Sequence, residues 1–194
     1  MLLIKRARLL NNVTNKLTVL SELLDEQRRI QHALFYCAPG QIDDVLRLIG
    51  LEHGLRVHRF TAQEPNAERT KLLQRFANGR LDGLVAMKCL DEGVDVPNTR
   101  SAYFLASSGN PREFIQRRGR ILRRAEGKAF AVVHDLIAVP PISSRSSATY
   151  SSERGIMRRE LTRFHEFANA ARNKHAALDV IWELASHYQL RDFG

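Results

Sequence analysis

The sequence contains little cysteine, and its few candidate metal ligands are not arranged to bind metal. Its two cysteines, Cys37 and Cys89, form no C-x-x-C pair. The seven histidines are scattered without ligand spacing: His32, His53, His58, His134, His165, His175 and His187. The sequence therefore predicts no metal site, and its cysteine usage fits a reducing compartment.

Long apolar runs are also missing. No stretch approaches the roughly 20 residues that a membrane span requires. The start, Met-Leu-Leu-Ile followed by Lys5 and Arg6, is too short an apolar stretch for a secretory signal. With 44% hydrophobic and 26% charged residues, the composition is typical of a soluble globular protein. We expect a cytoplasmic protein, associated with the nucleoid if it is bacterial.

Acidic residues are outnumbered by basic ones. Thirty Lys and Arg against 21 Asp and Glu give a formal net charge of +9. This excess favours a polyanionic partner, with nucleic acid the first candidate, although a generically basic surface is an equal alternative at this point.

Alternating apolar patterns predict the order of strands and helices. Short apolar runs predict strands at 32–40, 55–60, 82–87, 101–108 and 128–137. Helical spacing predicts helices at 41–50, with Gly50 at its end, between Pro65 and Gly79, and at 111–124. Strands separated by helices of this length predict βαβ units. The fold class is therefore α/β, a doubly wound parallel sheet with helices on both faces.

Both ends of the chain carry amphipathic helical patterns. Residues 1–31 contain an apolar stripe that predicts a helix docked on the core: Leu9, Val13, Leu17, Leu20 and Leu24. The core lobe is expected at 32–138, followed by a connection rich in Pro and Ser at 139–152. Apolar spacing after it predicts a helical hairpin at 153–194 that packs back on the lobe.

The most informative segment is SSGNPREFIQRRGRILRR, residues 107–124. In a helix, Gln116, Arg120 and Arg123 project from one face, because they follow at steps of four and three. Gly119 lies between them, where glycine weakens a helix unless the backbone breaks or approaches a neighbour. Arginine binds phosphate oxygens with two parallel hydrogen bonds. The pattern therefore suits a triphosphate, and a solvated basic face is the alternative.

This segment and the one before it resemble a known family. LDEGVDVP at 90–97 resembles motif V of superfamily 2 helicases, and PREFIQRRGRILR at 111–123 resembles motif VI, most closely in the XPB-like branch. HALFYCAPG at 32–40 resembles the strand of motif IV less specifically, and residues 60–79 are similar to the segment that precedes motif V. The resemblance covers about residues 32–137. It implies the C-terminal, RecA-like lobe of a helicase or translocase.

The resemblance implies roles for individual residues at an ATP site. Arg120 and Arg123 would be arginine fingers that reach the γ-phosphate, and Gln116 would order that contact. Asp95 would bind the ribose hydroxyls, with Gly93 letting the backbone come close. The alternative for Asp95 is an ordinary turn residue before Pro97.

At one position that concerns nucleic-acid contacts, the sequence departs from the family pattern. Many relatives have Ser or Thr, which touches a backbone phosphate, where this chain has Met87. Candidate replacements with phosphate-binding groups are Lys88, Gly40, Ser107 and Ser108, whose alternative is ordinary loop residues.

The chain also lacks the phosphate-binding loop that a complete motor needs. No G-x-x-x-x-G-K-S/T sequence occurs, since Gly127-Lys128 is followed by alanine. Asp91-Glu92 lies within the motif V resemblance and is not a Walker B pair. We therefore expect the ATP cradle and the Mg²⁺ ligands on an N-terminal RecA-like lobe, and no ATP hydrolysis by this chain alone.

Three functions stay open at this stage. The favoured one is half of a DNA motor that uses ATP with Mg²⁺. The second is a stand-alone basic module that binds nucleic acid, against which the ribose carboxylate Asp95 argues. The third is the motor part of a restriction or defence complex, in which the helical tail binds a protein partner.

Overall fold

The computed structural model describes residues 15–86, 96, 99–106 and 128–190. The chain divides into two compact units, one ending at Leu136 and the other beginning at Ile137. Leu9, Val13 and the helix expected at 111–124 lie outside the described residues. Within the described part, no helix is both long and apolar enough to span a bilayer.

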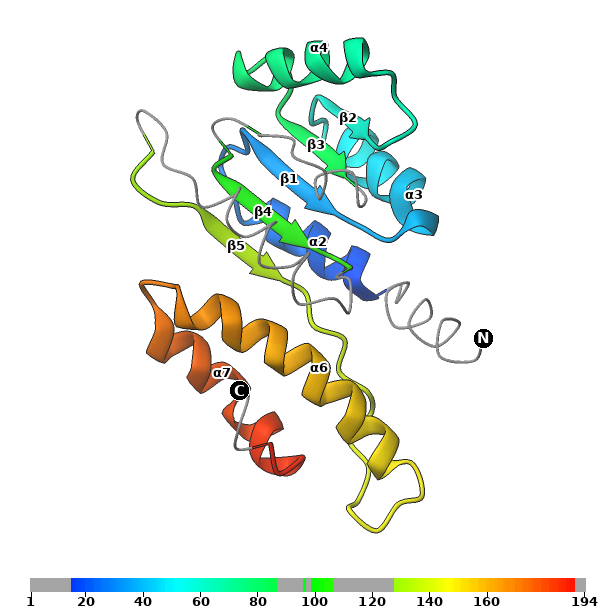
Figure 1. Ribbon diagram of the computed structural model, residues 1–194, viewed down its shortest axis with the longest axis vertical. Helices are drawn as coiled ribbons and strands as arrows, with labels where there is room; N and C mark the ends of the chain where they lie inside the picture. Colours follow the sequence, from blue (N-terminus) through cyan, green and yellow to red (C-terminus); the bar gives the residue numbers. More distant parts are fainter. Residues whose placement is uncertain (1–14, 87–95, 97–98, 107–127, 191–194) are drawn as a thin grey trace. The chain divides into compact units, whose positions relative to one another are not determined.

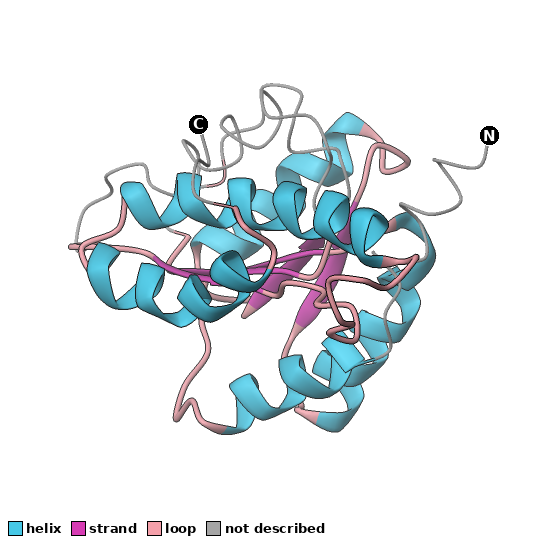
Figure 2. Ribbon diagram, turned by 90° about the horizontal axis from the view of Figure 1, so that it is seen from below, coloured by secondary structure: helices cyan, strands magenta, loops and turns pink. Residues whose placement is uncertain are grey.

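The first unit is built on a parallel sheet of five strands, which Figure 2 shows as one twisted layer. In chain order the strands are β1 Ala33–Tyr36, β2 Val57–Phe60, β3 Gly83–Ala86, β4 Ser101–Phe104 and β5 Val132–Asp135. Their order in space is β2-β3-β1-β4-β5, so β1 is central (Figure 1). All strands fall within the apolar runs that predicted them.

Helices cover both faces of this sheet. Helices α2 (Asn15–Asp25) and α3 (Ile42–Arg47) share one core with alternate strand residues such as Phe35 and Tyr103. Helix α4 (Asn66–Ala77) lies on the other face, where the Arg69 guanidinium carbon is 5.3 Å from the Phe60 ring centre. The predicted doubly wound α/β fold is therefore confirmed.

The predicted end of the helix at Gly50 was wrong. Helix α3 ends at Arg47 and continues as a π-helical turn, Leu48–Glu52, so the coil passes through Gly50. A Cβ atom on Gly50 would lie 3.4 Å from Val57 Cγ2. A side chain at position 50 would therefore make ordinary contact with β2, and the left-handed residue after this coil is Gly54, with φ of +66°.

The second unit is a helical hairpin. Helices α6 (Tyr150–Asn169) and α7 (Lys174–His187) bury a core of their own: Met157, Leu161, Ile181, Ala185, Tyr188 and Leu190. Arg154 Nε donates to the Tyr188 carbonyl at 2.9 Å, which ties α6 to the end of α7. Residues 139–149 contain no helix or strand. The expected packing of the hairpin on the lobe stays a prediction.

A row of rings crosses the first unit on the face covered by α2. The Phe35 and Tyr103 ring centres are 4.8 Å apart, and those of Tyr103 and His134 are 4.6 Å apart, with nearly parallel planes. At the end of this row Phe35 covers Gly83 of β3, since a Cβ atom there would lie 2.8 Å from Phe35 Cε2. Glycine at 83 is therefore required by packing.

We predict that Gly83→Ala destabilises the sheet by about 1–3 kcal/mol, because the new methyl group overlaps the Phe35 ring and the Ala33 carbonyl. The measurement is urea-dependent hydrogen exchange of the β1 and β3 amides. Gly155→Ala is the control, because a Cβ there meets nothing within 4 Å. Equal effects of the two changes on the sheet would contradict this packing argument.

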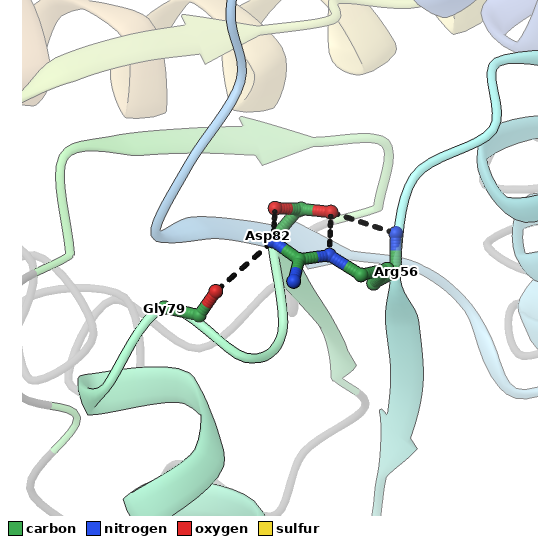
Figure 3. Close-up of polar contacts among 3 residues, drawn as sticks. All are labelled: Arg56, Gly79 and Asp82. Carbon is green, nitrogen blue, oxygen red and sulfur yellow. Dashed lines mark hydrogen bonds and ion pairs between the residues drawn. The ribbon is translucent and has the colours of Figure 1, made fainter.

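An ion pair joins the starts of β2 and β3 (Figure 3). Arg56 Nη2 is 2.7 Å from Asp82 Oδ1, Nε is 3.0 Å from Oδ2, and Nη2 also donates to the Gly79 carbonyl. Hydrogen bonds from the Arg56 side chain lower the pKa of Asp82, whose side chain is only 12% exposed. The pair fixes the loop between α4 and β3 against the adjacent strand.

We predict that Asp82→Asn lowers the free energy of unfolding at pH 7 by about 1 kcal/mol, a value discounted for the exposed Arg56 partner. Because the folded pKa is depressed, the carboxylate contributes its full stability above the unfolded pKa of about 3.9. That contribution disappears as pH falls through the folded pKa. Urea unfolding at several pH values checks this, and a difference that persists unchanged in acid would refute the ion-pair explanation.

Candidate functional site

Three neighbouring strands deliver the motif segments to one edge of the sheet. The residues after β1 form a 3₁₀ turn at Pro39–Gln41, β3 leads at residue 87 into the motif V segment, and β4 leads through Ala106 into the motif VI segment. Because β1 lies between β3 and β4 and all three are parallel, their carboxyl ends share an edge. Motifs V and VI therefore leave the sheet about 10 Å apart.

The order in which successive strands are added to the sheet changes direction between β1 and β4. In the order of the sheet, β2 lies on one side of β1, whereas β5 lies on the opposite side of β4, so the strands that follow β1 and β4 lie in opposite directions along the sheet. In open parallel sheets, a crevice forms between adjacent strands whose connections diverge, and ligands bind there. The pair β1 and β4 is such a switch point, with the 37–41 loop on one side of it.

Backbone hydrogen bonds hold this edge beyond the strand ends. Cys37 N donates to the Ala86 carbonyl at 3.2 Å, and Leu105 N donates to the Tyr36 carbonyl at 2.8 Å. The Tyr36 and Phe104 rings stack with centres 4.7 Å apart. The last described residues before both motif segments are therefore fixed against the central strand.

Among the predicted site residues, Gly40 is the one that the structure describes. It is exposed within the 3₁₀ turn after β1, which agrees with a position at the carboxyl edge. The other predicted site residues lie outside the described residues: Lys88, Gly93, Asp95, Ser107, Ser108, Gln116, Arg120 and Arg123. Their roles stay predictions, although the strands that lead to them are described.

Buried groups give the 37–41 loop its shape. The Gln41 side chain is buried, and its Oε1 accepts a hydrogen bond from Ala38 N at 3.4 Å. Burial raises the pKa of the Cys37 thiol to about 12, so this cysteine is protonated and unreactive at neutral pH.

No group of three His, Cys, Asp or Glu side chains suited to a metal ion occurs in the described ranges.

Lys16 is a residue of this edge that the sequence did not reveal. It lies in the first turn of α2, is only 5% exposed, and its Nζ donates to the Leu105 carbonyl at 2.7 Å. The apolar stripe of α2 gave no reason to bury a lysine. Its ammonium group therefore supports the chain two residues before the segment 107–124, which contains the motif VI resemblance.

Comparison with known proteins gives a family match. A family model described as the helicase conserved C-terminal domain matches residues 15–125. These residues include α2, the strands β1 to β4 and both motif segments. The match begins at α2 rather than at the sheet, which agrees with the packing of this helix into the core of the first unit.

Two relatives support the XPB-like resemblance. The DNA 3'-5' translocase XPB2 of Sulfurisphaera tokodaii is 42% identical over 65 residues, which are 34% of this chain and 15% of that protein. The putative DNA 3'-5' helicase Rad25 of Haloarcula marismortui is 36% identical over 66 residues, 34% of this chain and 11% of that protein. The chain thus spans a small part of the length of these relatives.

A solved structure supports the fold. The C-terminal domain of the DEAD-box protein Dbp5 matches with a TM-score of 0.54 and 22% identity, covering 66% of this chain and 72% of that one. At this identity the similarity concerns the fold alone. It agrees with the predicted RecA-like lobe.

We predict that Lys16→Met loosens the carboxyl end of β4, because the Leu105 carbonyl loses a charged donor; the stability cost is about 1–3 kcal/mol. Hydrogen exchange of the amides that follow Leu105 checks this and should become faster. Glu22→Met, at an exposed position of the same helix, is the control. Unchanged exchange after Leu105 in Lys16→Met would show that the contact does not hold this segment.

Proposed function

The chain belongs to the helicase conserved C-terminal domain family, and from this premise we propose that it is the C-terminal motor lobe of an ATP-dependent superfamily 2 DNA translocase or helicase. The observation that carries the proposal is the strand order β3-β1-β4. It brings the origins of motif V, of the 37–41 loop and of motif VI to one edge, although they lie far apart in the sequence.

In this proposal the motif VI arginines act on the γ-phosphate. Arg120 and Arg123 keep their charge at all relevant pH values and bind phosphate oxygens bidentately, so they stabilise the charge that spreads during phosphoryl transfer. Gln116 orders that contact. The segment that carries the arginines follows Leu105, which is held by hydrogen bonds to the Tyr36 carbonyl and from Lys16. These bonds fix the position of the backbone at which the segment begins.

Motif V and the neighbouring loops bind the remaining parts of the ligands. Asp95 accepts hydrogen bonds from the ribose hydroxyls, and Gly93 admits the backbone close to the nucleotide. Lys88, Gly40, Ser107 and Ser108 contact phosphates of the bound strand through an ammonium, a backbone amide and hydroxyl groups. Such contacts give affinity that does not depend on base sequence.

The rest of the ATP site comes from another lobe. The sequence has no phosphate-binding loop, so an N-terminal RecA-like lobe supplies it together with the Mg²⁺ ligands. The metal neutralises charge on the transferred phosphate when bound there. ATP closes the two lobes and places the arginines, and hydrolysis lets them open, which moves the protein along the strand. This chain alone is then inactive.

DNA is the proposed substrate. Both relatives described above carry DNA in their names, and the basic net charge of +9 suits a phosphate backbone. The helical hairpin α6–α7 is a candidate for contact with a protein partner. A stand-alone binding module would need the positive charge but would not need Asp95.

We predict that Arg120→Ala and Arg123→Ala, each in the natural protein with both lobes, lower DNA-stimulated ATP hydrolysis by about 10³ to 10⁵ in kcat. Removing a finger takes away stabilisation of the transition state, so ATP binding and the folded state are retained. Steady-state ATPase assays with single-stranded DNA, duplex DNA and RNA measure this and identify the preferred strand.

Arg118→Ala is the matched control, because it removes the same charge from the same segment but lies on the opposite face of the predicted helix from Gln116, Arg120 and Arg123. Retained turnover in Arg120→Ala would refute the finger assignment. A natural protein with no ATPase activity, together with salt-sensitive DNA binding, would favour the stand-alone binding module.

A further inference from the structure

The amino-terminal edge of the sheet, opposite the candidate site, collects arginines from distant parts of the sequence. Arg56 directly precedes β2, Arg100 directly precedes β4, Arg80 comes just before β3, and Arg28 and Arg29 lie between α2 and β1. Neighbouring strands are about 4.8 Å apart, so this row, which we call the amino-edge arginines, extends over about 15 Å.

A continuous set of backbone hydrogen bonds fixes the two ends of the row. Asp82 N donates to the Arg56 carbonyl at 2.7 Å, and Ala33 N donates to the Asp82 carbonyl at 2.9 Å. On the other side of β1, Arg100 N donates to the His32 carbonyl at 2.9 Å. The positions of Arg56 and Arg100 are therefore set by the ladder of the sheet.

Among the described residues, one of these guanidinium groups forms an ion pair, and Arg29 acts on the same carboxylate, Asp82, from a greater distance. All five arginines are exposed. Arg56 pairs with Asp82, whereas no ion pair to a described residue involves Arg28, Arg29, Arg80 or Arg100. The nearby carboxylate Asp25 is 3.4 Å from His53 Nδ1, and Glu26 interacts with His134. Five arginines against the three nearby carboxylates Asp25, Glu26 and Asp82 leave an excess of positive charge among the described residues of this edge.

The ends of helices account for part of this charge. Helices α2 and α4 run antiparallel to the strands, so their carboxyl ends, which carry about half a negative charge each, lie at this edge. Arg28, Arg29 and Arg80 follow those ends and stabilise them. Arg100 follows no described helix end, and four cations that form no ion pair within the described part of the chain exceed what two helix ends require.

We propose that the amino-edge arginines bind the phosphate backbone of nucleic acid as a second contact surface, separate from the motor site at the carboxyl edge. The choice of nucleic acid rests on the proposed function, and the surface itself rests on the geometry. Guanidinium groups bind phosphate oxygens bidentately, and a row of fixed cations matches a regularly charged strand. Binding there holds DNA that extends beyond the motor site.

The test compares two variants of the natural protein that have equal net charge. The edge variant is R28Q/R29Q/R80Q/R100Q, and the control R145Q/R158Q/R159Q/K174Q removes four positive charges from the second unit. The probe is a 30-base-pair duplex, whose Kd is measured without nucleotide at several salt concentrations. The slope of log Kd against log salt counts the phosphate contacts, at about 0.9 per contact.

We expect the edge variant to lose about two to four units of slope and at least about tenfold in affinity at 100 mM salt, with the control nearly unchanged. Since the two edges are separate, kcat for ATP at saturating DNA should stay within about twofold. Equal losses in both variants would overturn the proposal in favour of diffuse charge. An edge variant with a lower melting temperature and unchanged affinity would show that these arginines only stabilise helix ends.

The binding measurement uses no ATP, so its outcome is separable from that of the motor proposal. Suppose that the natural protein has no ATPase activity, but the edge variant binds DNA more weakly than the wild type and the control. The motor proposal would then fail, and the second contact surface would remain supported. An active ATPase in which both variants bind DNA like the wild type would remove this surface and leave the motor proposal intact.

Discussion

The central strand β1 is the constraint on which the rest of the first unit depends. Its four residues, Ala33 to Tyr36, are at most 2% exposed, so water cannot satisfy their backbone groups. They must pair with β3 on one side and β4 on the other. The same pairing continues past the strand at both ends, through His32 and Cys37. Both edges of the sheet are thus positioned by one buried segment.

Side-chain packing makes this pairing specific. On one face, Phe35 stacks on Tyr103 and covers Gly83. From β3 to β5 this face is therefore occupied by stacked rings, and the absence of a side chain at Gly83 leaves room for the first of them. On the other face, Tyr36 stacks on Phe104. A shift of one residue in register would exchange these two faces and bring Cβ atoms against rings. Glycine at 83 and the alternating aromatics therefore define one register.

Much of the fold followed from the sequence, because strands buried on both faces appear as short continuous apolar runs. The site was reached through motif resemblance, since periodicity does not encode the order β2-β3-β1-β4-β5. Gly50 was misread because the coil continues through it as a π-helical turn, and the glycine with the left-handed φ is Gly54. Lys16 was missed because a charged residue at the start of an amphipathic helix normally faces solvent. Its burial depends on the Leu105 carbonyl, which is 89 residues away.

The two edges of the sheet can carry different charges for different purposes because they are separated. A strand of four residues spans about 13 Å, which exceeds the Debye length of about 8 Å at physiological ionic strength. A phosphate at the carboxyl edge is therefore screened from cations such as Arg56 and Arg100 at the amino edge. In the described part of the first unit, the buried charged side chains are Lys16 near the carboxyl edge and Asp82 at the amino edge. Charge on one edge can consequently change without altering the chemistry of the other, which is the condition that the proposed nucleotide site and the proposed second contact surface both require.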